Sequence, residues 1–244
     1  MIRSQVEQAA RNNAIWCDTI CRAHGVAGEF DAAVWFNRNP VPRFYPNVVT
    51  LVEQRHIATQ FAQIQDLAAS FPGHWAVKDS FAELDLSALA FELLFEANWI
   101  WRAPSARLPN THDQEVQWVR LQGAAQLAQW ESAWSGNPIG HSATPQPRLF
   151  LPALLADPDV AFIAAYQGNE MIAGAIANRT DTVVGLSNLF TPPADHVAFW
   201  AGCVATAQAT FPGLPLVGYE SGADLVRAEA VGFEKLQSLR VWGR

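Results

Sequence analysis

The sequence lacks several features that would place it in a familiar class. Its three cysteines, Cys17, Cys21 and Cys203, are too few for the disulfide framework of a small secreted protein. No apolar run approaches the roughly 18 residues of a membrane-spanning helix. The first residues, MIRSQVEQAARNN, are too polar for a signal peptide. We therefore expect a protein of the reducing cytoplasm with no membrane partner.

Charge and nucleotide-binding motifs are also sparse. Only 16% of the 244 residues are charged and the net charge is −7, so no basic surface is expected to bind nucleic acid. Neither G-x-x-x-x-G-K-[ST] nor G-x-G-x-x-G occurs, which disfavours nucleotide hydrolysis and dinucleotide redox chemistry. Half of the residues are apolar, enough for a sizeable core.

What the sequence does contain is an internal repeat, with copies about 140 residues apart. Residues 71–102 begin FPGHWAVKDS, and residues 211–244 begin FPGLPLVGYE. Each copy follows a helix-like segment. The sequence of each copy predicts, in order, a Phe-Pro-Gly turn, a short apolar strand, a polar stretch, a brief helix and a last strand that ends in Trp-Arg or Trp-Gly-Arg. We interpret this as duplication of one α/β unit.

Ahead of the first copy, residues 2–24 have apolar side chains at helical spacing and Gly25 as a stop signal. Residues 37–47 hold three prolines and predict an irregular loop that carries Phe44 and Tyr45. The ten tryptophans predict mainly core packing, and some of them could line an aromatic ligand pocket together with Phe44 and Tyr45.

Residues 103–114 are small, polar and marked by prolines, which predicts a linker between a domain of residues 1–102 and a domain of residues 115–244. In the second domain we expect a strand, a helix, a long irregular loop at 135–148 and a short helix. Three strands at 160–167, 170–179 and 182–189 follow, and Gly168-Asn169 joins the first two as a tight hairpin. The second repeat copy closes the chain.

This order of elements, ending in AEAVGFEKLQSLRVW, resembles the GNAT superfamily of acetyl-CoA-dependent N-acetyltransferases. Gly232 and Phe233 match the Gly-Phe pair of that family, and residues 236–242 match its terminal strand. The stretch FIAAYQGNEMIAGAIANRTDTVVGLSNLFTPP looks like its central hairpin and splayed strand. The resemblance implies an α/β fold (α+β in some schemes), with a mixed, mostly antiparallel sheet flanked by helices. The N-terminal domain would then be a truncated GNAT-like copy with a helical extension.

The resemblance also implies a cofactor site for acetyl-CoA. Backbone groups of the splayed strand would hold the pantetheine arm and polarise the acetyl carbonyl, here at Ser187, Asn188, Leu189, Phe190 and Thr191. For Ser187 and Asn188 a strand bulge is the other interpretation. The N-terminus of the next helix, at Asp195, His196 and Val197, would contact the pyrophosphate. The glycine-rich turn that usually precedes this helix in the family is absent, since the segment reads TPPADHVAFWAG.

Proton transfer would depend on two residues at a strand end. The tyrosine that commonly precedes the Gly-Phe pair by four residues is Ala228 here. Tyr219 is the nearest substitute as a general acid, unless its hydroxyl simply meets solvent. Glu220 could act as a general base for an amine or be a solvated turn carboxylate.

Two functions follow from these observations. The first is an N-acetyltransferase that acts on a small-molecule amine. The alternative is a GNAT-like protein with a degenerate cofactor site that serves as a non-catalytic binding or regulatory module. A transferase of other acyl groups is a weaker third interpretation.

Two other clusters contain residue types that often bind ligands or metals. Lys78, Asp79 and Ser80 follow a predicted strand, where ligand contacts are common, although a salt bridge or helix cap is the more frequent use. Cys17, Cys21 and His24 share one helix face, but no fourth ligand is spaced nearby, so we expect no metal site.

Overall fold

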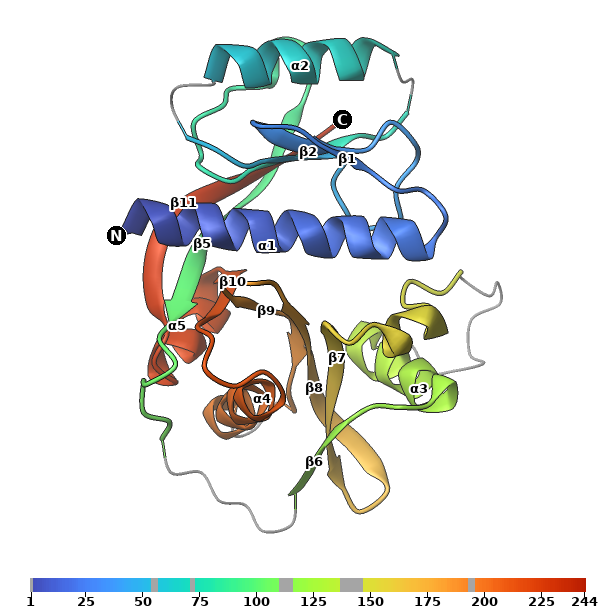
Figure 1. Ribbon diagram of the computed structural model, residues 1–244, viewed down its shortest axis with the longest axis vertical. Coiled ribbons are helices and arrows are strands. Elements are labelled where there is room, and N and C mark those ends of the chain that lie inside the picture. Colours follow the sequence, from blue (N-terminus) through green and yellow to red (C-terminus); the bar gives the residue numbers. More distant parts are fainter. Residues whose placement is uncertain (1, 54–56, 71–72, 110–115, 137–146, 193–195) are drawn as a thin grey trace. The chain divides into compact units, whose positions relative to one another are not determined.

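The computed structural model of the chain (Figure 1) describes residues 2–53, 57–70, 73–109, 116–136, 147–192 and 196–244. Four sequence predictions fall at least partly outside these ranges. They are the first Phe-Pro-Gly turn, residues 110–114 of the expected linker, most of the loop expected at 135–148, and Asp195 of the expected pyrophosphate contact. Over the described residues no helix is long and apolar enough to cross a membrane.

The chain divides into two compact units. The first comprises Met1–Trp99 together with Leu236–Arg244, and the second comprises Ile100–Lys235. The predicted division into domains of residues 1–102 and 115–244 assigned the last strand of the chain, residues 234–243, to the second domain. In the structure that strand pairs inside the first unit.

The first unit has its strands in the order β1-β2-β3-β4-β11-β5. The β3–β4 pair is parallel, and β1–β2, β2–β3 and β4–β11 are antiparallel. Its elements are α1 (Ile2–Ala23), β1 (Glu29–Phe30), β2 (Val34–Phe36), β3 (Val48–Thr50), α2 (Ile57–Ser70), β4 (Ala76–Asp79), the 3-10 helix η1 (Ser87–Leu89), β5 (Glu92–Arg102) and β11 (Glu234–Gly243). The strands β5 and β11 each cross the boundary between the units by a few residues.

Alternation along the strands assigns one helix of the first unit to each face of its sheet. Val34, Phe36 and Val48 pack against α2, whereas Trp35 and Val49 pack against α1. Figure 1 shows the two helices on opposite sides of these strands. The two faces of β2 and β3 therefore belong to two separate apolar clusters, one under α2 and one under α1.

The second unit has its strands in the order β10-β9-β8-β7-β6, with the end of β5 beside β10. The pairs β6–β7, β7–β8 and β8–β9 are antiparallel, and β9–β10 is parallel. Its elements are β6 (Val116–Arg120), α3 (Ala124–Ser135), the 3-10 helix η2 (Pro152–Ala156), β7 (Val160–Gln167), β8 (Glu170–Arg179), β9 (Val184–Phe190), α4 (His196–Thr210), β10 (Leu216–Glu220) and α5 (Gly222–Ala230).

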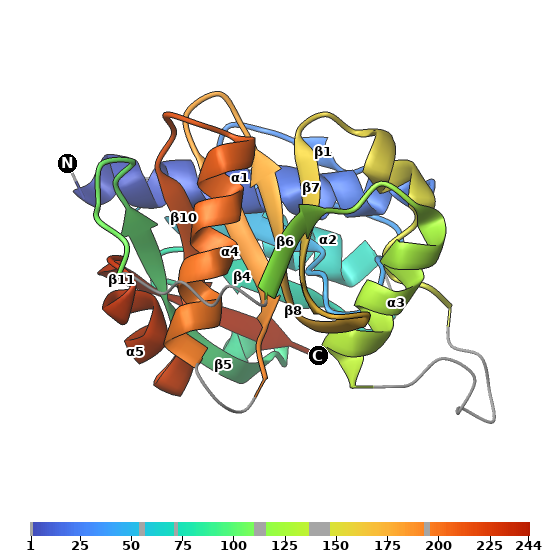
Figure 2. The same cartoon turned by 90° about the horizontal axis from the view of Figure 1, so that it is seen from below.

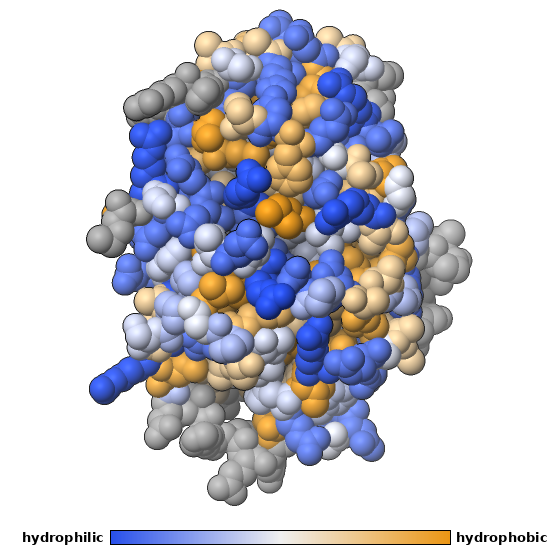
Figure 3. All heavy atoms as spheres, in the orientation of Figure 1, coloured by the Kyte–Doolittle hydropathy of each residue, from blue (hydrophilic) through white to orange (hydrophobic). Residues whose placement is uncertain are grey.

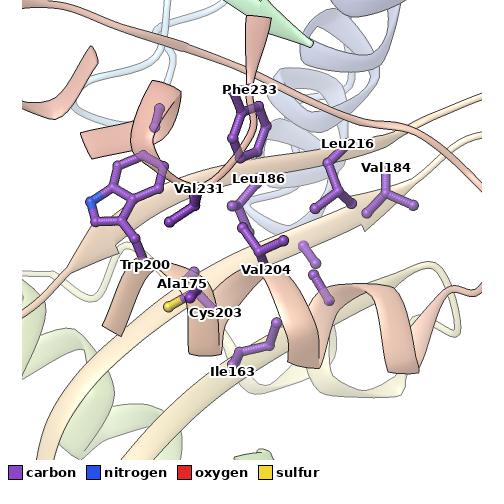
Figure 4. Packing of buried hydrophobic residues seen from close by; sticks show 14 of the residues in the cluster. Ile163, Ala175, Val184, Leu186, Trp200, Cys203, Val204, Leu216, Val231 and Phe233 are labelled. Atoms are coloured by element: carbon purple, nitrogen blue, oxygen red, sulfur yellow. The ribbon is translucent and has the colours of Figure 1, made fainter. Parts of the chain in front are cut away.

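Helices α4 and α5 cover one face of this second sheet. The cluster in Figure 4 joins Trp200 and Val204 of α4 to Ile163, Leu186 and Leu216 of the strands. Figure 2 shows α4 running along the strands. The close fit needs Gly202, because a Cβ there would come within 2.1 Å of the Trp118 ring.

A cage of aromatic rings covers the other face. Trp130 of α3 is fully buried and donates its indole N–H to Ile163 O at 2.9 Å. Phe150, Phe162 and Phe190 each meet the Trp130 ring edge-on, with centroids 5.3 to 5.5 Å away. Such contacts stabilise beyond the burial of area alone, so this cage fixes α3 on the sheet.

The two repeat copies exchange their last strands. The last strand of the second copy, β11, pairs with the first copy, and the last strand of the first copy, β5, lies beside the second copy. β11 pairs antiparallel with β4, from Arg240 opposite Asp79 to Gly243 opposite Ala76. The end of β5 lies beside β10, where Ile100 is 3.6 Å from the Cβ position of Gly218. Each compact unit is therefore completed by a strand from the other half of the sequence.

Most predicted elements are confirmed, including the hairpin at Gly168-Asn169 and the shared order helix, strand, short helix, strand in both repeat copies. The strands β1 and β2 were missed, because elements of two and three residues are too short to show a period. On the face shown in Figure 3, apolar side chains lie among hydrophilic ones.

Candidate functional site

The parallel strands β9 and β10 pair only at their first residues. The register joins Val184 with Leu216 and Gly185 with Val217. Gly218 still lies close to β9, since its Cβ position is 2.7 Å from Leu186 O. Both strands continue beyond this point, to Phe190 and Glu220, with no further paired residues among those the structure describes. The backbone of β9 on this side is thus left without a strand partner.

A bulge marks the place where the two strands part. On the other side of β9, Ile176 pairs with Ser187 and Gly174 pairs with Phe190, so β9 holds one extra residue. Asn188 adopts φ 52, in the left-handed region that asparagine tolerates better than most residues. Bulges bend a strand and end its pairing, so the residues Ser187 and Asn188 explain the divergence locally.

Ser187 carries a buried hydroxyl that has no hydrogen-bond partner. A buried polar atom without a partner costs free energy, and native structures rarely keep one without a reason. Ser187 stands at the bulge, next to the stretch of β9 that has no pairing with β10. The bulge, one of the two interpretations of this residue from sequence, is confirmed.

The side chains of Leu189 and Phe190 are used by the fold. Leu189 packs against the cluster under α4, and Phe190 packs edge-on against Trp130 with centroids 5.3 Å apart. Both residues were predicted to bind the cofactor. The structure uses their side chains in the core, and the prediction for these residues concerned their backbone groups.

Thr191 and His196 connect the end of β9 to the start of α4. The Thr191 hydroxyl and the His196 Nδ1 are hydrogen-bonded at 2.5 Å. The first turn of α4 has no acidic side chain, and the first N–H groups of any helix lack partners within it. His196 and Val197 therefore present donors to an anion, whereas Asp195 lies outside the described residues.

Tyr219 and Glu220 lie at the end of β10, just beyond the last paired residues. Successive residues of a strand point to opposite faces, so Glu220 shares the face of Leu216 under α4 and α5, and Tyr219 points to the other face. Burial, with the nearby carboxylate of Asp224 as a second cause, raises the pKa of Glu220 to about 8. No cation pairs with Glu220 among the described residues.

The position of the family's usual tyrosine is filled by a core residue. Ala228 is fully buried in the cluster shared by α4 and α5. Tyr219 is the phenol nearest in sequence to the point where β9 and β10 diverge.

The cluster Lys78, Asp79 and Ser80 serves the structure of the first unit. Lys78 Nζ donates to Asn13 Oδ1 at 2.8 Å, and Asp79 accepts the backbone N–H of Leu84 at 2.8 Å. The Ser80 N–H donates to Thr50 Oγ1 at 2.8 Å, so the parallel strands β3 and β4 remain connected at their ends. The corresponding parallel strands β9 and β10 diverge.

Burial also raises the pKa of the thiols of Cys17 and Cys21, to about 11 and about 12, so both are protonated near neutral pH. The structure therefore gives these cysteines the properties of small apolar core residues.

Comparison with protein-family models and with curated protein sequences found no match. Solved structures do match. A GCN5-related N-acetyltransferase from Kribbella flavida aligns over 96% of this chain and 95% of its own, with TM-score 0.65 and 13% identity. A GCN5-related N-acetyltransferase-like protein from Streptococcus suis covers 100% of both chains, with TM-score 0.54 and 12% identity.

A tandem GNAT protein from the clavulanic acid biosynthesis pathway aligns over 86% of this chain and 78% of its own, with TM-score 0.56 and 10% identity. The chain therefore has the GNAT fold, a mixed and mostly antiparallel sheet flanked by helices, as predicted. At these identities the match defines the fold alone.

One residue of the site was overlooked in the sequence. Gly218 interrupts the apolar strand LVGYE, and an isolated glycine in a strand is a signal of close backbone approach. In the structure its Cβ position is 2.7 Å from Leu186 O of β9, one residue beyond the last paired residue of β10, Val217.

Proposed function

We propose that the protein transfers the acetyl group of acetyl-CoA to a small-molecule amine where β9 and β10 diverge. The GNAT fold makes this reaction class the natural hypothesis, although a fold alone does not define an activity. The observation that carries the proposal is local. The pairing of two parallel strands stops close in sequence to a bulge, to a buried hydroxyl without a partner and to a half-buried carboxylate with a raised pKa.

The residues present suit the cofactor in three places. Backbone groups of Ser187–Thr191 would hold the pantetheine arm, and the Ser187 hydroxyl would gain the partner it lacks. The N–H groups of His196 and Val197 in the first turn of α4 would contact the pyrophosphate, favoured by the dipole of the helix. When bound, acetyl-CoA supplies a thioester whose carbonyl carbon bonds to the amine nitrogen while its C–S bond breaks.

Glu220 would take the proton that the amine nitrogen must lose. With a pKa of about 8, its carboxylate is a stronger base than an ordinary glutamate and is well matched to an amine near neutral pH. Tyr219, on the opposite face of β10, would donate its phenolic proton to the departing thiolate.

Two measurements on the whole chain test the proposal. The first is thermal unfolding with and without acetyl-CoA, since a ligand at about 100 times its dissociation constant stabilises by roughly 2.7 kcal/mol. The second is release of free thiol from acetyl-CoA with a panel of small amines. The rate is expected to rise through about pH 8 as Glu220 loses its proton.

Two variants assign the proton carriers. Glu220→Gln should lose at least tenfold in kcat and flatten the pH profile while still binding acetyl-CoA. Glu229→Gln, the same substitution on the exposed side of α5, is the matched control and should leave both unchanged. Tyr219→Phe should lower kcat without lowering affinity. If millimolar acetyl-CoA leaves the melting temperature unchanged, the cofactor site is degenerate and the non-catalytic interpretation takes the place of this one.

A further inference from the structure

The strand β5 is the last strand in the sheet of the first unit, so it forms one edge of that sheet. The strand β10 lies beside the end of β5 that belongs to the second unit, where Ile100 is next to Gly218. Burial changes along β5 in the same way. Its first five residues, Glu92–Glu96, are exposed, whereas Trp99 and Ile100 are buried. The start of β5 is therefore an edge that the described part of the chain leaves accessible.

This accessible edge is apolar at its centre. It reads Glu-Leu-Leu-Phe-Glu, with Leu93 46% exposed, Leu94 58% exposed and Phe95 43% exposed. Eight large hydrophobic side chains are exposed among the described residues, and these three are the only consecutive ones. Successive residues of a strand point to opposite faces, so the apolar surface covers both faces of the edge. Natural proteins usually cover such an edge, because its backbone groups and apolar side chains favour pairing with another strand.

The sequence of this edge is self-complementary, because Glu-Leu-Leu-Phe-Glu reads almost the same in both directions. Antiparallel pairing with a second molecule, about a two-fold axis at Leu94, puts the two Leu94 side chains opposite each other. The same pairing puts Leu93 opposite Phe95 of the second molecule. Apolar pairs directly opposite each other stabilise antiparallel strands, and a two-fold axis closes the assembly at two molecules.

The charges at the two ends of the edge limit the strength of this pairing. Glu92 would lie opposite Glu96 of the second molecule, and like charges directly opposite each other are destabilising. Within one molecule, however, Glu96 Oε1 forms an ion pair with Arg240 Nε at 2.5 Å. Each Glu92 therefore meets a carboxylate that already has a cation, and the apolar centre can outweigh the remaining repulsion.

We propose that the protein forms a two-fold dimer in which Glu92–Glu96 of β5 pairs antiparallel with the same residues of a second molecule. Two strands of five residues give an interface at the small end of the range for specific complexes. A dissociation constant on the order of 10 μM is therefore expected. The dimer forms through the first unit and does not depend on acetyl transfer.

Sedimentation velocity of the whole chain, from about 1 μM to about 200 μM, tests the proposal across the expected dissociation constant. The parent is expected to change from monomer to dimer, and Leu93→Lys and Phe95→Lys should each weaken the dimer at least tenfold. Val226→Lys is the matched control, because Val226 is an apolar residue of α5 that is 65% exposed. Circular dichroism melting verifies that each variant is folded. A parent that stays monomeric at every concentration, or an equal loss in the control, would overturn the proposal.

Two further variants test the register. Leu94→Cys should form a disulfide between two molecules under mild oxidation, since the proposed axis brings the two sulfur atoms within reach of each other. Val226→Cys is the control for random cross-linking, and the native cysteines are buried. Glu92→Lys puts a cation opposite Glu96 of the second molecule and should tighten the dimer at least threefold. A dimer that Leu94→Cys does not cross-link, or that Glu92→Lys weakens, would contradict the proposed pairing.

Discussion

Gly218 of β10 lies so close to Leu186 of β9 that a Cβ at Gly218 would come within 2.7 Å of the Leu186 carbonyl oxygen. Gly218 directly follows the last paired residue of β10, Val217, and the atom that a side chain would meet is backbone. Gly218→Ala should therefore force the strands apart and destabilise the protein by about 1–3 kcal/mol.

Urea denaturation measures this effect. Gly123→Ala is the matched control, because the nearest atom to its Cβ position is 3.4 Å away and belongs to the flexible side chain of Gln126. A variant Gly218→Ala that is as stable as Gly123→Ala would show that the contact between β9 and β10 is looser than described.

The contact between Gly202 and Trp118 predicts that Gly202→Ala lowers the stability of the protein, whereas helix propensity alone would predict an increase. Alanine is favoured over glycine inside a helix by about 1 kcal/mol, yet its Cβ at position 202 would lie 2.1 Å from the Trp118 ring. We expect Gly202→Ala to destabilise by roughly 1–3 kcal/mol. Adding Trp118→Leu should recover part of the loss in a double-mutant cycle, whereas purely additive effects would contradict the contact.

The exchange of terminal strands predicts that substitutions at Trp242 and Phe233 loosen different parts of the protein. Trp242 packs with α2 and β4 in the first unit, whereas Phe233, nine positions earlier by sequence number, packs under α4 in the second. Hydrogen–deuterium exchange should show that Trp242→Ala loosens residues 57–79 and that Phe233→Ala loosens residues 160–210. Loss of protection around α4 in Trp242→Ala would place β11 with the second half instead.

Glu220 also predicts a dependence of stability on pH. Its pKa is raised from 4.5 to about 8 in the folded state, so the unfolded chain loses this proton first. The contribution of Glu220 to stability is therefore complete below about pH 4.5 and is lost as the pH rises through about 8. Glu220→Gln removes this loss.

The variant should gain on the order of 2 kcal/mol relative to the parent between pH 5 and pH 9, after allowance for solvent contact. Urea denaturation at the two pH values measures the gain, with Glu229→Gln as control. An equal difference between Glu220→Gln and the parent at both pH values would mean that Glu220 ionises like an exposed carboxylate.

Much of the fold could be predicted from the sequence because its elements carry strong local signals. The apolar spacing of residues 2–24, the Gly168-Asn169 turn and the Gly-Phe pair at 232–233 each depend on a few adjacent residues. The partner of β11 could not be predicted, because pairing with β4 or with β10 satisfies the same apolar pattern. The register of β11 with β4 and the packing of Trp242 distinguish the two in the structure.

The candidate site stays a prediction. The resemblance assigned the ligand contacts of Ser187–Thr191 to backbone groups, but the packing of their side chains could not be predicted from sequence. The side chains of Leu189 and Phe190 are taken by the core. The raised pKa of Glu220 depends on burial by residues distant in sequence.

Hydrogen–deuterium exchange of the whole chain with and without acetyl-CoA tests the central claim most directly. The account predicts that saturating acetyl-CoA slows exchange at the amides of residues 187–191 and at the start of α4, since these N–H groups gain partners there. Unchanged exchange in both segments at saturation, or protection elsewhere only, would contradict it.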